Sequence, residues 1–216
     1  MEIKSYSNKK AYFFAITIVA LIVASPYIGA IANYAALVLF VVSACSLQKI
    51  DLYIILFAIF PFANIFKASA ESMSFLTICE IIMFILVFAD FLSKKITVKA
   101  SFMGAVFLFF AYLLIMGLDD FSFSIFSKMI VRPFILYSLF NSKADYEKKK
   151  AVTIGLTYML ALSMILMLFL TLNSSFMERI VDYLRVVQMQ NGLRQLTRNG
   201  GLFDDPNYCS LAIMMT

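Results

Sequence analysis

Two arginines and a short stretch with a Gly-Gly pair and a proline near the end of the sequence have the spacing of an anion-binding site. Arg194 and Arg198 are four residues apart, so they share a face if this part of the chain is helical. The chain breaks at residues 199–201, and Asp205 followed by Pro206 then has the pattern of a helix N-cap and first helical position. Guanidinium groups beside the free N–H groups of a helix N-terminus bind phosphate or carboxylate. The alternative is that arginines in a long outer loop carry no function.

Four charged side chains lie within or near apolar segments, namely Glu80, Asp90, Lys128 and Arg132. A charge at bilayer depth costs at least about 2.5–3.5 kcal/mol, so such residues usually face a partner or a cavity. Asp90 and Lys128 are close to the ends of predicted spans, and we expect their charged groups to reach the membrane surface. Glu80 and Arg132 are both predicted in the outer half of the membrane. Two interpretations stay open for them, a structural ion pair and a role in an outward-facing substrate cavity.

The sequence contains no histidine, which excludes histidine-based metal sites, general bases and catalytic triads within this chain. Its three cysteines, Cys45, Cys79 and Cys209, are far apart in apolar stretches, so they predict neither a disulfide framework nor a thiolate cluster. We expect them to be small apolar packing residues. Neither a metal nor a cofactor is predicted.

The composition places the elements that carry these residues in a membrane. Of 216 residues, 62% are hydrophobic and 14% are charged, and the mean hydropathy is +0.90. A soluble domain is typically about half apolar and about a quarter charged. With so few charged side chains, the chain lacks the polar surface of a water-soluble globule. We therefore predict an all-α fold, a polytopic transmembrane helix bundle, which has the lipid bilayer as a partner and binds no nucleic acid.

Cutting the sequence at its charges predicts a single transmembrane domain over residues 1–216, with about seven complete spans and the start of an eighth. The uncharged run 11–48 is too long for one span, and Pro26 and Gly29 near its middle predict a tight turn. Pro61 predicts a kink in the short third span. The expected helices are 11–25, 28–47, 52–66, 74–92, 101–118, 123–141, 151–172 and the incomplete 206–216.

The lysines predict how these helices are oriented. Most of them fall in four clusters, and two predicted spans separate each cluster from the next. The positive-inside rule places all four clusters in the cytoplasm. The N-terminus is then cytoplasmic and 173–205 is an extracytoplasmic loop, in a multi-pass protein of the inner or plasma membrane. The clusters are Lys4/Lys9/Lys10, Lys49, Lys94/Lys95/Lys99 and Lys143/Lys148/Lys149/Lys150.

The outer loop is predicted to begin with an amphipathic helix that lies in the membrane interface. Ser175 and Glu178 have the spacing of a capping box, which would start this helix. Apolar residues then recur at helical spacing, at Phe176, Ile180, Leu184 and Val187.

The end of this loop carries a motif that resembles a known family. Arg198-x-x-Gly201-Leu202-Phe203-x-Asp205-Pro206-Asn207-Tyr208 is similar to the R-x-x-G-x-F-x-(D/N)-P-N motif of the O-antigen ligase and bacterial polysaccharide polymerase superfamily. In that family the motif lies at the end of an outer loop and opens the next transmembrane helix, as predicted here. It spans eleven residues, and the predicted helix layout covers the rest of the chain.

The resemblance implies an enzyme that needs no metal, a glycosyltransferase of capsule, exopolysaccharide or O-antigen synthesis. Its substrate would be an oligosaccharide linked to undecaprenyl pyrophosphate, which it transfers to a saccharide acceptor on the outer face. Flippase and chain-length regulator proteins are further partners that the resemblance implies. We expect Arg198 to be the catalytic arginine, Asp205 and Pro206 to shape the motif, and four residues to contribute to substrate binding. These four are Arg132, Arg194, Gly201 and Asn207.

Other functions stay open beside a polymerase. A ligase would share the motif, although the ligase branch has a further outer loop with a His that this chain lacks. Members of the family are generally longer, so we expect this sequence to be an N-terminal portion of such a protein, and an inactive membrane fragment is a further alternative. A secondary transporter of an anionic solute is disfavoured, since the interruptions at Pro26 and Pro61 do not recur as an inverted repeat.

Overall fold

The computed structural model describes residues 8–69, 72–93 and 131–184, with the single positions 96, 99, 101, 102, 104, 107, 108 and 111. In these residues the secondary structure is helical apart from an isolated antiparallel bridge between Ile96 and Ser142, which confirms the all-α prediction. Three of the described helices are long and apolar enough to cross a membrane: α1 (Lys9–Ile28), α4 (Phe75–Leu92) and α8 (Tyr146–Leu172). The count of about seven spans stays a prediction.

The chain divides into two compact units, and α4 and α8 each contribute residues to both. The first unit contains Met1–Cys79 and Lys150–Thr216, and the second contains Glu80–Lys149. The first therefore holds α1, α2, α3 and most of α8, and the second holds most of α4 together with α7.

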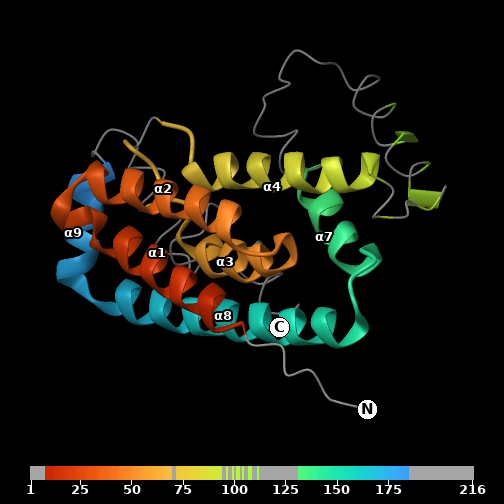
Figure 1. Ribbon diagram of the computed structural model, residues 1–216. Coiled ribbons are helices and arrows are strands. Elements are labelled where there is room, and N and C mark those ends of the chain that lie inside the picture. The colour runs from red at the N-terminus through yellow and green to blue at the C-terminus, as the bar shows by residue number, and fades with distance from the viewer. Residues whose placement is uncertain are drawn as a thin grey trace. The chain divides into compact units, whose positions relative to one another are not determined.

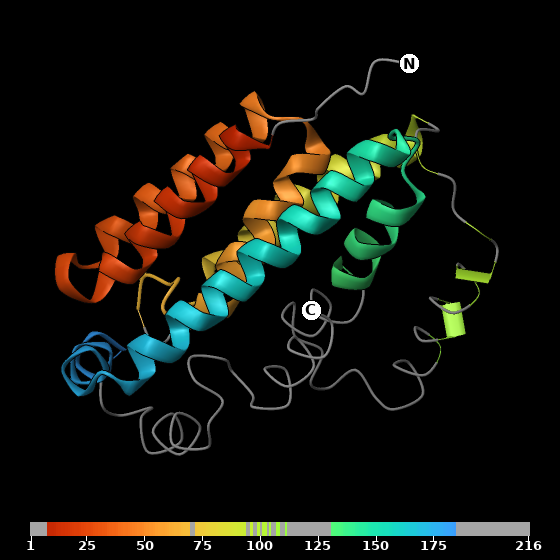
Figure 2. The ribbon, with the colours of Figure 1, turned by 90° about the horizontal axis from the view of Figure 1, so that it is seen from below.

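A hairpin of two helices begins the first unit. α1 and α2 (Ala30–Ser46) run antiparallel beside each other, as Figures 1 and 2 show. Gly29 makes the turn with a φ of 93°, a conformation that side chains disfavour. The hairpin buries one face of α1 and leaves large apolar side chains such as Phe13 and Ile16 exposed on the other. Apolar residues on both faces are typical of a helix surrounded by lipid.

α1 continues through Pro26 and ends at Ile28, three residues beyond the predicted end. Proline lacks an N–H group and leaves the carbonyl four residues earlier without its helical donor. That carbonyl belongs to Ile22, and the Ser25 hydroxyl donates to it at 2.7 Å. The serine therefore satisfies the carbonyl that Pro26 cannot reach.

The core of the first unit is formed by a short helix between two 3-10 turns. α3 (Leu52–Ile59) lies between η1 (Lys49–Asp51) and η2 (Phe60–Phe62), and nearly all of its side chains are buried. A helix that is apolar all round belongs inside a protein or a membrane bundle. It is shorter than the predicted 52–66, because the helical hydrogen-bonding pattern changes at Phe60, next to Pro61.

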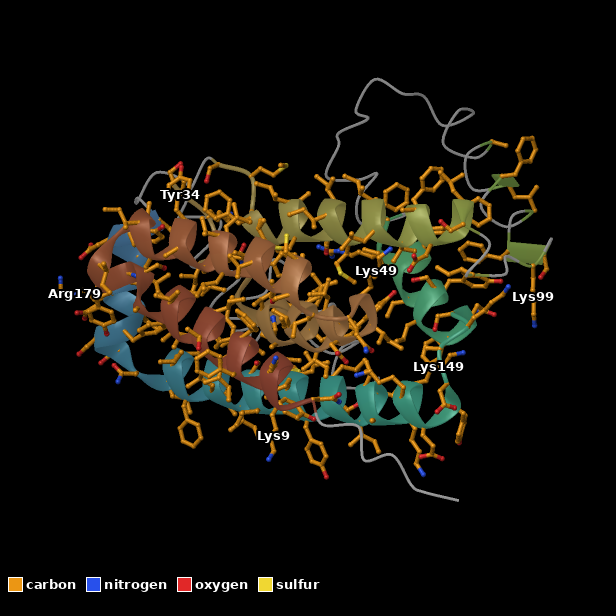
Figure 3. The ribbon with its side chains drawn as sticks, viewed as in Figure 1. Lys9, Tyr34, Lys49, Lys99, Lys149 and Arg179 are labelled. Carbon is orange, nitrogen blue, oxygen red and sulfur yellow. The ribbon has the colours of Figure 1, made fainter. Side chains whose placement is uncertain are left out.

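α8 spans the first unit from one end to the other. Its 27 residues make a helix about 40 Å long. Near its start, the Asn8 amide donates to the Ala151 carbonyl at 3.1 Å, which places this end beside Lys9. It begins five residues before the predicted start at 151, because lysines 148–150 are part of the helix and do not precede it. Figure 3 shows Lys9 and Tyr34 at opposite ends of the α1–α2 pair.

The short helix α9 (Ser174–Leu184) follows α8 and packs against α1. The predicted capping box of Ser175 and Glu178 is wrong. The Phe176 N–H donates to the Asn173 side-chain oxygen at 3.0 Å, so Asn173 is the N-cap. α9 begins only two positions after the last residue of α8, and Asn173 is the one residue between them.

The second unit contains α7 (Arg132–Asn141) and most of α4. The predicted helices 74–92 and 123–141 include these two. The predicted helix 101–118 lies mostly outside the described residues, and 206–216 lies entirely outside them.

Candidate functional site

An ion pair joins α4 and α7 in the second unit. Arg132 Nε lies 2.6 Å from Glu80 Oε1, which confirms that the two charges meet. The Glu80 side chain is 2% exposed and that of Arg132 is 24% exposed. A buried carboxylate is tolerated when a hydrogen-bonded cation neutralises it. The pair therefore lowers the cost of placing these two charges in apolar helices.

Aromatic side chains of the second unit pack against one another. Phe84, one turn after Glu80, packs edge-on against Phe134 with ring centroids 5.4 Å apart. Phe102 stacks on Tyr137 at 4.0 Å, and the Tyr137 hydroxyl accepts a hydrogen bond from the Lys99 N–H.

Pro133 directly follows Arg132 at the start of the described α7. It therefore lies in the first turn of α7, a position that proline tolerates. A substrate-binding role for Arg132 stays a prediction.

The remaining predicted site residues, Arg194, Arg198, Gly201, Asp205, Pro206 and Asn207, lie outside the described residues. The described chain reaches Leu184, the last residue of α9, and Arg179 on that helix points away from the protein in Figure 3. The predicted amphipathic pattern agrees with α9, because Phe176 and Ile180 are buried while Glu178 and Arg179 are exposed.

A polar cluster at the Gly29 end of the first unit was not predicted from the sequence. The Asn33 amide group donates to the Ile65 and Lys67 carbonyls at 2.5 and 2.6 Å, and to the Tyr183 hydroxyl at 3.2 Å. Tyr183 in turn donates to the Lys67 carbonyl at 2.7 Å. Burial raises the pKa of the Tyr183 phenol above 10.0, and its hydrogen bonds with Asn33 and Ser25 oppose that rise. An asparagine in the uncharged run 11–48 is the signal that could have indicated this cluster.

A groove of about 420 Å³ runs between α1 and α8. Ala20 and Ala24 leave space on α1, and leucines 162 and 166 line the α8 side. Its lining is almost entirely apolar, so water would find few hydrogen-bond partners there. Between two helices with the length and composition of membrane spans, such a groove suits a hydrocarbon chain.

Comparison with known proteins identifies no relative of this chain. No family model, curated protein or solved structure matches the chain. Its function is therefore inferred from the motif and from the geometry of the described residues.

Metal-binding residues do not gather in the part of the chain that the structure describes, where no group of three or more Cys, Asp or Glu could hold an ion. Cys79 is buried, in agreement with its predicted packing role. Cys45 is exposed on α2, so the packing interpretation is wrong for that residue.

Proposed function

We propose that this chain belongs to a membrane glycosyltransferase of polysaccharide synthesis, of the polymerase type. It would transfer an oligosaccharide from a lipid pyrophosphate to a saccharide acceptor on the outer face. The observation that carries the proposal is the motif from Arg198 to Asn207, which follows α9 and precedes an apolar run. A ligase that uses the same donor is the nearest alternative.

Two features of the first unit support a lipid-linked donor. The apolar groove between α1 and α8 offers a hydrocarbon-lined path for an isoprenoid chain. α9 lies at the Gly29 end of the helices, and Lys9 lies at the other end. The sequence that follows α9 therefore starts at the end opposite to Lys9, which suits a donor whose pyrophosphate lies at the outer surface.

The proposed chemistry asks little of the protein beyond positioning and charge stabilisation. The acceptor hydroxyl forms a bond to the anomeric carbon, the bond from that carbon to the pyrophosphate oxygen breaks, and the hydroxyl proton is released. The pyrophosphate takes the electron pair and gains negative charge. An arginine contacts phosphate oxygens through two N–H groups and stabilises that charge where it develops.

The test is substitution of Arg198 in cells that depend on the protein for polymer. Arg198→Ala should lower polymer output by about 100-fold, the loss typical for removal of one donor to a developing anion. Arg198→Lys should rescue little, because an ammonium group lacks the planar two-pronged contact. The protein should still accumulate in the membrane, and lipid-linked single repeat units should build up.

Arg179→Ala is the matched control, because Arg179 is an exposed arginine on α9 and should tolerate the change. Polymer of normal amount and length from Arg198→Ala would contradict the proposal. Loss of polymer that merely follows loss of the protein would assign Arg198 a structural role in the loop.

A further inference from the structure

α9 is held by protein contacts on its apolar face. Phe176 and Ile180 are 2% and 0% exposed, and the Phe176 ring lies 6.2 Å from that of Tyr27 on α1, measured between centroids. A helix that merely rested on the membrane surface would leave this face to lipid. The first two turns of α9 are therefore docked on the first unit.

Hydrogen bonds hold the other end of α9. Tyr183 lies in its last turn, donates to the Lys67 carbonyl and accepts from Asn33. The same Asn33 amide binds the Ile65 and Lys67 carbonyls, so one buried side chain connects α2, the 65–67 turn and α9. We name these contacts of Asn33, Tyr183 and the 65–67 carbonyls the Tyr183 latch.

Burial of Asn33 in the Tyr183 latch costs free energy. Asn33 is 0% exposed, and its side-chain oxygen has no hydrogen-bond partner among the described residues. Burying an unpaired polar atom is unfavourable, and an apolar residue would avoid it. The two carbonyls fix the amide orientation, because only its NH₂ group can donate to them. Asn33 therefore contributes to the structure through the hydrogen bonds that its NH₂ group donates.

We infer that Tyr183 is a positioning residue for the proposed glycosyl transfer, because the latch fixes the point from which the arginine-bearing segment departs. This inference rests on the proposed function of Arg198. Fifteen positions separate Tyr183 from Arg198 in the sequence. The latch therefore holds the last described turn before the segment that carries Arg198. Tyr183 itself contacts neither substrate nor reacting atoms in this role.

The experiment is Tyr183→Phe, which removes the hydroxyl and keeps the ring, measured beside Tyr158→Phe and Arg198→Ala. Tyr158 is an exposed tyrosine on α8 and serves as the matched control. We expect polymer per molecule of protein to fall about five-fold in Tyr183→Phe, the loss expected from weakening one hydrogen-bonded anchor. Tyr158→Phe should leave polymer output unchanged.

A second measurement tests the Tyr183 latch independently of polymer synthesis. Spin labels at Ile31 on α2 and Asp182 on α9, both exposed positions, report the distance between the hairpin and the end of α9. The distance distribution should broaden in Tyr183→Phe and keep its width in Tyr158→Phe. A purely structural role would instead lower the amount of protein in the membrane.

Three outcomes would overturn the inference. An unchanged distance distribution in Tyr183→Phe would show that the latch does not hold α9. Normal polymer from Tyr183→Phe, together with a loss in Arg198→Ala, would remove the positioning role and leave the proposed function intact. Normal polymer from Arg198→Ala would remove the proposed function, and with it the reaction that Tyr183 is inferred to position.

Discussion

At the scale of single residues, two buried polar side chains among the described residues make specific contacts between helices. Glu80, buried within α4, is neutralised by Arg132 at 2.6 Å. Asn33, buried within α2, donates to two carbonyls and to Tyr183. In both cases the alternative is a polar group left in an apolar surrounding, which is costly. Polar contacts of this kind join helices that the hydrophobic effect alone cannot hold together inside a membrane.

The Glu80–Arg132 pair leads to a prediction about stability. Arg132→Gln should destabilise the protein by about 3–5 kcal/mol, because it leaves the buried Glu80 carboxylate without this cation. Glu80→Gln should cost less, because Arg132 is 24% exposed. Exchanging the two charges should restore part of the loss. The measurement is a double-mutant cycle on the thermal stability of the detergent-solubilised protein, with Glu147→Gln, an exposed carboxylate on α8, as the control. Additive effects of the single changes would show that the pair contributes no coupling energy.

At the scale of elements, close packing of α8 in the first unit depends on a glycine. A Cβ atom at Gly155 would lie 2.7 Å from the Tyr12 hydroxyl and 2.9 Å from Ile54 Cδ1. Small residues let transmembrane helices approach closely, and here the absence of a side chain brings α8 against α1 and α3. Gly104, in contrast, is exposed and has nothing within 4 Å of its Cβ position.

Substitutions at these two glycines should therefore change the stability of the protein in opposite directions. Gly155→Leu should destabilise the first unit by about 1–3 kcal/mol through overpacking, and Gly155→Ala by less, since alanine favours the helix. Gly104→Ala should be neutral or slightly stabilising. The check is the melting temperature in detergent, which should fall by several degrees only for the Gly155 variants. Equal melting temperatures for Gly155→Leu and the wild type would disprove close packing at this position.

At the scale of the whole molecule, the orientation of the first unit in a membrane stays a prediction from the lysines. Lys9 and the start of α8 lie at one end, and α9 lies at the other. The positive-inside rule assigns the lysine end to the cytoplasm. Residues from α9 onward, including the motif of Arg198, would then face the outside, as the proposed function requires.

Cysteine labelling tests this orientation. In a variant whose three native cysteines are replaced by alanine, Ser174→Cys on α9 and Glu147→Cys at the start of α8 are both exposed positions. A membrane-impermeant thiol reagent should label position 174 in intact cells and position 147 only after the cells are opened. Glutamate contributes little to topology, so its replacement leaves the orientation signal in place. Labelling of position 147 in intact cells would reverse the assignment.

The sequence by itself determined the features that depend on neighbouring residues. Long apolar runs, charges at their ends and the breaks near Gly29 and Pro61 are local patterns, and they predict the helical class and the approximate helix positions. The pairing of Glu80 with Arg132 was also accessible, because a chain with so few charges offers few partners for a buried carboxylate.

Only the tertiary structure decided the contacts between segments that lie far apart in the chain. Asn33 and Tyr183 are 150 residues apart, and no local pattern relates an amide in α2 to a hydroxyl in α9. Local sequence also allowed more than one outcome at three other positions. These are the continuation of α1 through Pro26, the N-cap at Asn173 and the close helix approach at Gly155. The physical reason is that such local preferences amount to only about 1–3 kcal/mol, so packing against distant helices selects among them.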